Sequence, residues 1–225
     1  MSFTWTSLIS PEYPQVVTAA IVTTGLVGVG LHARKSLGTG QGAVVPAGRV
    51  SVRGFFETIT EFITELADSV IGSHGRAYVP LFASLFTFIL INNLTGILPG
   101  VVPATENLNT TLAMGLFVFV AYNIIGLKTN GISYLKHFMG PVWYLIPLML
   151  PIEIISNCLR PLTLGLRLSN VLRGDHMVVG VFTDLIPLLI PIPFYALGLI
   201  VALVQAFVFT LLSMVYVSLA TAHEH

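Results

Sequence analysis

The chain has 225 residues, of which 55% are hydrophobic and only 9% are charged. Soluble domains carry about 25% charged residues, so this composition excludes an ordinary soluble domain and indicates a membrane protein. Ten basic residues balance ten acidic ones, which argues against the basic patch that nucleic-acid binding requires. The single cysteine, Cys158, excludes an internal disulfide.

The first apolar run covers residues 16–31 and is followed by Arg34 and Lys35. Basic residues gather on the cytoplasmic side of membranes, so this run is predicted to span from outside to inside. It is expected to remain as an anchor, because no basic segment of a secretory signal precedes it. A glycine-rich basic loop follows. Residues 1–54 therefore form the first predicted unit, an outside-to-inside span with a cytoplasmic loop.

Residues 55–72 have the period of an amphipathic helix. The acidic side chains recur every three or four residues opposite the apolar ones, and they are Glu57, Glu61, Glu65 and Asp68. Such a helix can lie along the membrane interface. Its acidic face is either simply solvated or a docking face for another subunit.

Two further spans are predicted at about residues 78–98 and 111–127. The first carries Asn93 near its end, and the loop between them has Glu106 as its only charge, which fits the outside of the membrane. Lys128 then returns the chain to the inside. Residues 55–140 are therefore the second predicted unit, an interfacial helix followed by a two-span hairpin.

The remaining residues, 141–225, form the third predicted unit, two long apolar helices that meet near residues 184–193. Each exceeds the ~20 residues that cross a bilayer, so each must tilt or bend. Pro147, Pro151 and Pro161 indicate kinks or a broken start. The predicted fold is an all-α membrane protein with five spans plus the interfacial helix, and with the last two helices long and tilted as a hairpin.

A polar stripe lies within this apolar hairpin. Glu153, Arg160 and Arg167 follow one another at intervals of seven residues, nearly two helical turns, and Asn157 joins their face. An arginine in hydrocarbon costs at least ~2.5 kcal/mol and does not lose its proton in a protein. Arg167, which lies between leucines, is therefore predicted to be a functional, permanent cation.

The other polar residues of the hairpin leave alternatives open. Arg160 either extends to the interface from near a helix start or supplies an auxiliary charge. Glu153 either transfers protons or forms an ion pair with Arg160 or a partner subunit. Asp175 and His176 either titrate within a path or are solvated near a helix end, and Arg173 precedes them as a further charge.

The final helix, about residues 190–222, carries Gln205 in an otherwise apolar run. A buried amide in a membrane needs a hydrogen-bond partner. Gln205 therefore either bonds to a neighbouring helix or orients a nearby arginine or water. Tyr216 lies three turns further along and is a candidate to line a wet path.

Three segments resemble subunit a of the F-type ATP synthase: RPLTLGLRLSNVLRGDH at residues 160–176, LVQAFVFTLLSMVYVSLA at 203–220 and HGRAYVPLFASLFTFILINNLTGILPG at 74–100. The resemblance runs from about Phe55 to the C-terminus. It implies that Arg167 is the family's essential arginine, that Glu153 is the acid before it, and that Gln205 is the glutamine of the last helix.

Two departures from the family pattern accompany this resemblance. His176 stands where many members have a glutamate, and the histidine that pairs with that glutamate is replaced here by Gly198. In addition, Asn170 follows Arg167 one place earlier than in many members. The resemblance nevertheless implies a proton path through Arg167, Glu153, Gln205, His176, Asp175, Asn93, Asn157 and Tyr216, with Arg160 and Arg173 as auxiliary charges.

The implied function is that of a stator subunit with two half-channels against a rotating c-ring. The outer one would be lined by Asn93, Glu153, Asp175, His176 and Gln205, and the inner one would open near Arg167. The implied partners are the c-ring, peripheral-stalk b subunits, the lipid bilayer and protons. No cofactor, metal or nucleic acid is expected, and the location is expected to be a bacterial plasma membrane rather than an organelle.

The chain itself is not expected to be an enzyme, because it has no glycine-rich phosphate-binding loop. Two other functions compete with the proton channel. A secondary transporter with a midplane site is expected to show internal repeats, and we find no convincing one. A membrane scaffold would not need a leucine-flanked arginine.

Overall fold

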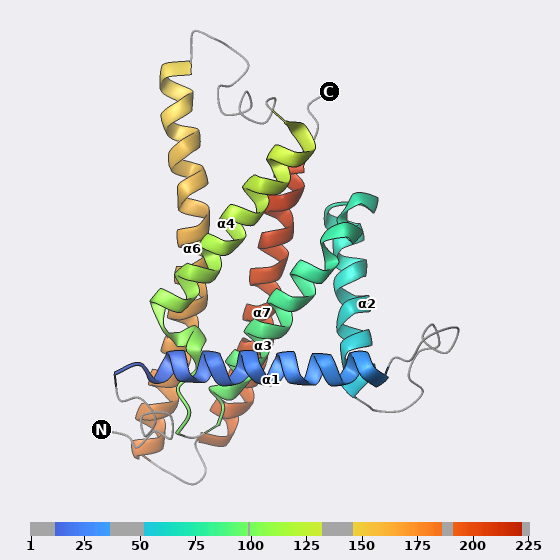
Figure 1. Ribbon diagram of the computed structural model, residues 1–225. Helices are drawn as coiled ribbons and strands as arrows, with labels where there is room; N and C mark the ends of the chain where they lie inside the picture. The colour runs from blue at the N-terminus through green and yellow to red at the C-terminus, as the bar shows by residue number, and fades with distance from the viewer. Residues whose placement is uncertain (1–11, 37–51, 99, 132–145, 186–190, 222–225) are drawn as a thin grey trace.

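The computed structural model describes residues 12–36, 52–98, 100–131, 146–185 and 191–221 (Figure 1). Within these ranges the chain forms helices and no strand, which confirms the predicted all-helical class. The α-helices are α1 (Pro14–Ser36), α2 (Val52–Val70), α3 (Val79–Thr95), α4 (Leu108–Asn130), α6 (Ile146–Leu185) and α7 (Pro191–Thr221). Two short 3-10 helices are η3 (Ser73–Tyr78) and η4 (Ala104–Glu106). Most of the basic loop, the turn of the last hairpin and the last four residues lie outside the described ranges.

Four of the described helices are long and apolar enough to cross a membrane, namely α1, α3, α4 and α7. The fourth predicted span in chain order corresponds to α6. It is 40 residues long and continues as one helix through Pro151 and Pro161. Because α6 carries several charged side chains, it is not apolar enough to count as a candidate span. The described helices therefore provide four candidate spans, whereas the sequence predicted five.

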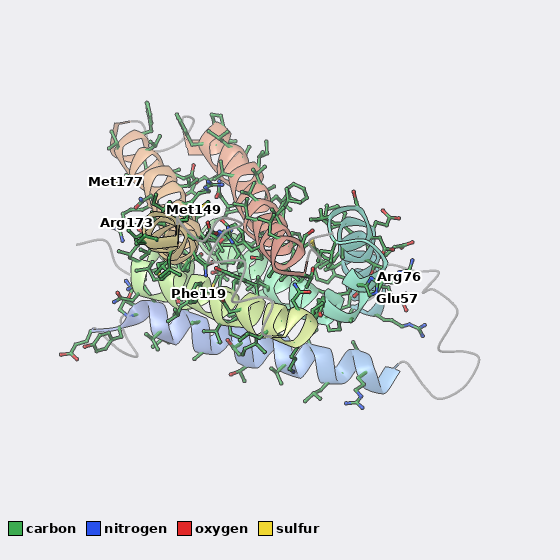
Figure 2. The ribbon with its side chains drawn as sticks, turned by 90° about the horizontal axis from the view of Figure 1, so that it is seen from above. Glu57, Arg76, Phe119, Met149, Arg173 and Met177 are labelled. Carbon is green, nitrogen blue, oxygen red and sulfur yellow. The ribbon has the colours of Figure 1, made fainter. Side chains whose placement is uncertain are left out.

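The helices do not form a parallel bundle (Figure 1). α1 runs across the long axes of α2, α6 and α7, while α3 and α4 cross the molecule obliquely. Seen from above, Arg173 and Met177 lie toward one end of the molecule, and Glu57 and Arg76 lie at the opposite end (Figure 2). The hydroxyl of Thr18 on α1 donates a hydrogen bond of 2.8 Å to the carbonyl of Val102, which attaches α1 to the loop before α4.

Glycines allow α4 and α6 to pack backbone against backbone. A Cβ atom placed on Gly165 of α6 would lie 2.8 Å from the carbonyl oxygen of Thr111 on α4, and one on Gly115 of α4 would collide with the carbonyl of Pro161. Real Cβ atoms essentially never approach a neighbour below 3.0 Å. This contact therefore fixes the position of α6 along α4.

α2 is attached to the bundle by its apolar face. Ile59, Ile63 and Ala67 are buried, while the acidic side chains lie on the other face, as the sequence pattern predicted. Arg76 donates hydrogen bonds of 2.8 to 3.1 Å to the carboxylate of Asp68. These bonds hold the pKa of Asp68 below its ordinary value.

Candidate functional site

α6 has a buried face and an exposed face, and Arg167 lies on the exposed one. The buried face packs into the core through Leu164, Leu168 and Leu172. The exposed face carries Leu159, Leu162 and Leu166, with exposed fractions of 49%, 43% and 38%. These two faces follow from the helical period, since leucines three and four apart share one side of the helix.

Arg167 has no hydrogen bond or ion pair to any residue in the described part of the chain. The neighbouring helix α7 adds further exposed apolar side chains, which are Leu199, Ile200, Leu203 and Val204. The α6–α7 pair therefore presents exposed apolar side chains beside the permanent cation of Arg167. Such a cation requires an anionic or aqueous partner from outside the described residues.

In the C-terminal half of α6, three side chains contact Glu106, the last residue of η4, which precedes α4. The Nδ1 atom of His176 lies 3.1 Å from Oε2 of Glu106. Ser169 donates a hydrogen bond of 2.7 Å to the carbonyl of Glu106, and Arg173 donates one of 3.2 Å to the same oxygen. The loop acid and the helix histidine are thereby held as a pair.

Two glycines make room for this pair and for the adjacent acid. A Cβ atom on Gly96 would lie 2.8 Å from Cε1 of His176, and one on Gly198 of α7 would lie 2.7 Å from Oδ2 of Asp175. The carboxylate of Asp175 thus occupies the space that a side chain at position 198 would need. We name Glu106, Asp175 and His176 the loop-end cluster.

A second group of polar contacts lies nearer the N-terminal end of α6. The guanidinium carbon of Arg160 lies 5.5 Å from the centre of the Tyr216 ring on α7. The Tyr122 hydroxyl of α4 donates a hydrogen bond to Oδ1 of Asn157, which is only 7% exposed. The structure therefore brings together the predicted residues Asn157, Arg160 and Tyr216.

Gln205 lies on α7 between Gly198 and Tyr216, and Asn93 of α3 contacts α7 nearby. The Asn93 amide donates a hydrogen bond of 3.1 Å to the carbonyl of Ala202, three residues before Gln205. The Oδ1 atom of Asn93 is buried without a partner, and the Gln205 side chain has no hydrogen bond within the described residues. Buried polar atoms of this kind are usually satisfied by water or a further ligand.

The structure does not bring Glu153 to His176. Both belong to α6, and they are 23 residues apart, which corresponds to about 35 Å of helix. Glu153 is half-buried and has no ion pair in the described ranges. The predicted outer lining, which includes both Glu153 and His176, therefore contains two residues that lie far apart along one helix.

Comparison with known proteins identifies the family. The family model described as "ATP synthase A chain" matches residues 16–218. The chain belongs to the ATP synthase A chain family. "ATP synthase subunit a" of Bdellovibrio bacteriovorus is 58% identical over 229 residues and is covered completely, as is this chain.

Other relatives of this family give the same result. "ATP synthase subunit a 2" of Syntrophotalea carbinolica is 42% identical over 95% of this chain and 88% of its own length. "ATP synthase subunit a" of Geobacter sulfurreducens is 42% identical over 91% of this chain and 89% of its own length. The resemblance to subunit a is thereby confirmed, and this member of the ATP synthase A chain family is a membrane protein of ATP synthesis and proton transport.

Sequence reasoning missed Glu106 and Tyr122 as members of the candidate site. Glu106 could have been noticed because it is the only charge of its loop. Tyr122 gave no such signal, since a tyrosine in an apolar span is more often a packing residue. In the described ranges of this ATP synthase A chain, no group of three His, Cys, Asp or Glu side chains could hold a metal ion.

Proposed function

We propose that this chain is the proton-conducting stator subunit of an F-type ATP synthase, which forms two half-channels against a rotating c-ring. The observation that carries the proposal is the exposed Arg167 on the apolar face of α6, which has no partner among the residues that the structure describes. A permanent cation among exposed apolar side chains suits a moving carboxylate supplied by another protein. Family membership supports the same function.

The first half-channel leads to the loop-end cluster. His176 and Glu106 can exchange a proton across their 3.1 Å contact, and Asp175 extends the cluster toward α7 at Gly198. The unsatisfied oxygen of Asn93 and the free amide of Gln205 then continue a polar route toward the apolar face. This cluster takes the place of the acid–histidine pair that many members of the family carry at the positions of His176 and Gly198.

The second half-channel lies at the other end of α6. Glu153 and Asn157 share its polar stripe, and Arg160 and Tyr216 lie beside it. We therefore assign Glu153 to this inner path rather than to the outer one. Arg167 lies between the two groups, about 13 Å along the helix from His176 and about 21 Å from Glu153.

Arg167 separates the two paths because a guanidinium does not release its proton and so cannot relay one. A ring carboxylate that is protonated from the outer path becomes neutral and can face lipid at low cost. After rotation it reaches the inner path, where the nearby cation favours its ionised form. Each proton that crosses provides about 2.3 kcal/mol per 100 mV, so several must pass for each ATP.

The three predicted units have separate roles in this proposal. Residues 1–54 anchor the chain, residues 55–140 support the long hairpin, and residues 141–225 carry the ion path. The catalytic ATPase head is a different protein. The partners are the c-ring, peripheral-stalk b subunits and the lipid of a bacterial plasma membrane. The exposed apolar faces of α1, α6 and α7 are suited to these neighbours.

Isolation of the native complex tests the proposal. A tagged chain, extracted from its membrane in mild detergent, is expected to co-purify with a c-ring and an ATPase head. A tagged chain that consistently purifies alone, as a transporter would, is incompatible with the stator role.

A Glu153→Gln variant is expected to slow proton transport without abolishing it, because the amide cannot take up a proton but water and Asn157 remain in the path. Proton flux through the reconstituted complex provides the measurement. A flux equal to that of the unaltered complex at every pH would exclude Glu153 from the path.

A Gly198→Ala variant is expected to push the Asp175 carboxylate away from α7, because the new methyl group would lie 2.7 Å from Oδ2. Proton flux should fall by up to about 100-fold, at the lower end of what a positioned acid–base group contributes. Asp175→Asn should have a similar effect, and the double variant should be no slower than Asp175→Asn alone. Effects that multiply would show that the two residues act independently.

A further inference from the structure

Three helices meet around Arg160. Its guanidinium carbon lies 5.5 Å from the centre of the Tyr216 ring on α7, within the about 6 Å at which a ring face attracts a cation. The Tyr216 ring lies 5.8 Å from the Tyr122 ring on α4. The Tyr122 hydroxyl bonds to Asn157, which is one turn before Arg160 on α6. These contacts form a closed circuit through α6, α7 and α4, and we call Asn157, Tyr122 and Tyr216 the tyrosine clamp.

The base of the tyrosine clamp is fixed by burial. Tyr122 is 1% exposed, and its ring packs edge to face against Phe119 with centres 5.5 Å apart. Asn157 is buried and uses its side-chain oxygen to accept the tyrosine hydroxyl. Tyr216 therefore packs against the Tyr122 ring, whose orientation is restricted by burial. This contact holds the Tyr216 ring under the guanidinium of Arg160.

The charge of Arg160 is held in place but is not neutralised. No carboxylate pairs with it among the described residues. An aromatic face attracts a cation through its quadrupole and contributes no negative charge. A carboxylate in the same place would cancel the field that Arg160 exerts on its surroundings.

We propose that the tyrosine clamp holds Arg160 as a second fixed cation of the inner half-channel, and that Tyr216 and Tyr122 are its positioning residues. This inference rests on the proposed function, in which a ring carboxylate passes along α6. Arg160 is seven residues, or about 10 Å of helix, from Arg167. A protonated ring carboxyl that reaches the inner path after rotation would meet this second positive charge as well as Arg167. That charge favours the ionised form of the carboxyl and so promotes release of its proton into the inner path.

The test uses the whole ATP synthase reconstituted in vesicles, with ATP-driven proton pumping as the readout. Tyr216→Leu and Arg160→Gln are each expected to slow pumping roughly fivefold, within the range of one cation–π contact. The Tyr216→Leu/Arg160→Gln double variant should be no slower than Arg160→Gln alone. Tyr216→Phe keeps the ring and Arg160→Lys keeps the charge, so both should recover most of the rate. Tyr195→Leu, the same change elsewhere on α7, provides the control.

A milder substitution in the core keeps the proposal testable if Tyr216→Leu prevents the subunit from folding. Tyr122→Phe removes only the hydroxyl that anchors the tyrosine clamp to Asn157, and it should slow pumping about twofold while the complex assembles in normal amount. The inference is overturned if Tyr216→Leu pumps as fast as Tyr216→Phe, or if the Tyr216→Leu and Arg160→Gln effects multiply. Normal pumping by Arg167→Ala would instead overturn the proposed function, so the two failures are distinguishable.

Discussion

An Arg167→Ala variant is expected to abolish ATP-driven proton pumping by the reconstituted complex. Arg167 is the exposed cation on the apolar face of α6, and no described residue of the chain pairs with it. Alanine removes both the attraction for the ionised carboxylate and the barrier between the two paths. Passive proton leak through the membrane sector should therefore rise while coupled pumping is lost. Acidification of vesicles, followed with a pH-sensitive dye, measures both quantities.

Two comparisons make this result specific to the position. Arg34→Ala removes an exposed arginine at the end of α1 and should leave pumping unchanged. Arg167→Lys keeps a charge but replaces a planar guanidinium by an ammonium that can lose its proton, so it should restore little activity. A normal pumping rate in Arg167→Ala would show that the cation is not part of the transport mechanism.

Gly165→Val is expected to prevent normal assembly of the complex. The first side-chain atom would lie 2.8 Å from the carbonyl oxygen of Thr111, and a backbone atom of a packed helix cannot move aside as a flexible side chain can. Overpacking of a core typically costs about 1–3 kcal/mol and occasionally more. The amount of assembled complex per cell membrane and its thermal midpoint should both fall.

Gly180→Val is the matched control for this substitution. Gly180 belongs to the same helix, and a Cβ atom placed on it has no neighbour within 4 Å in the described structure. Both variants replace glycine by valine within α6, so they change helix propensity and side-chain volume equally. A difference in assembly between them therefore measures the effect of the α4–α6 contact. Equal assembly of both variants would mean that α6 can shift along α4 at little cost.

The helices of this chain could be predicted from its sequence because their signals are local. Long apolar runs and the acidic period of residues 55–72 indicated the described helices to within several residues at most ends. The sequence also singled out Arg167, since a leucine-flanked arginine is costly wherever its helix lies, and its functional role stays a prediction. Family membership, suspected from three segments, is confirmed by a match over residues 16–218.

The contacts across the site could not be predicted, because they join residues that are far apart in the chain. Glu106 meets His176 across 70 residues, and the Asp175 carboxylate fills the space beside Gly198. The sequence showed that position 198 is a glycine instead of a histidine, but it did not show that the Asp175 carboxylate fills the space left by the missing side chain. Likewise, the seven-residue spacing put Glu153 and Arg167 on one stripe without indicating which group of partners each would join.

The crossing of α1 over α6 has a consequence for where a proton leaves. If α1 crosses the bilayer along its length, α6 lies close to the plane of the bilayer (Figure 1). The proton entry site near His176 and the exit site near Glu153 would then be displaced by about 35 Å in the plane of the bilayer. They would not face each other across the hydrocarbon layer. No straight file of water through the subunit could link two such openings. A proton must therefore be carried in the plane of the bilayer from one opening to the other by a group that moves relative to this subunit.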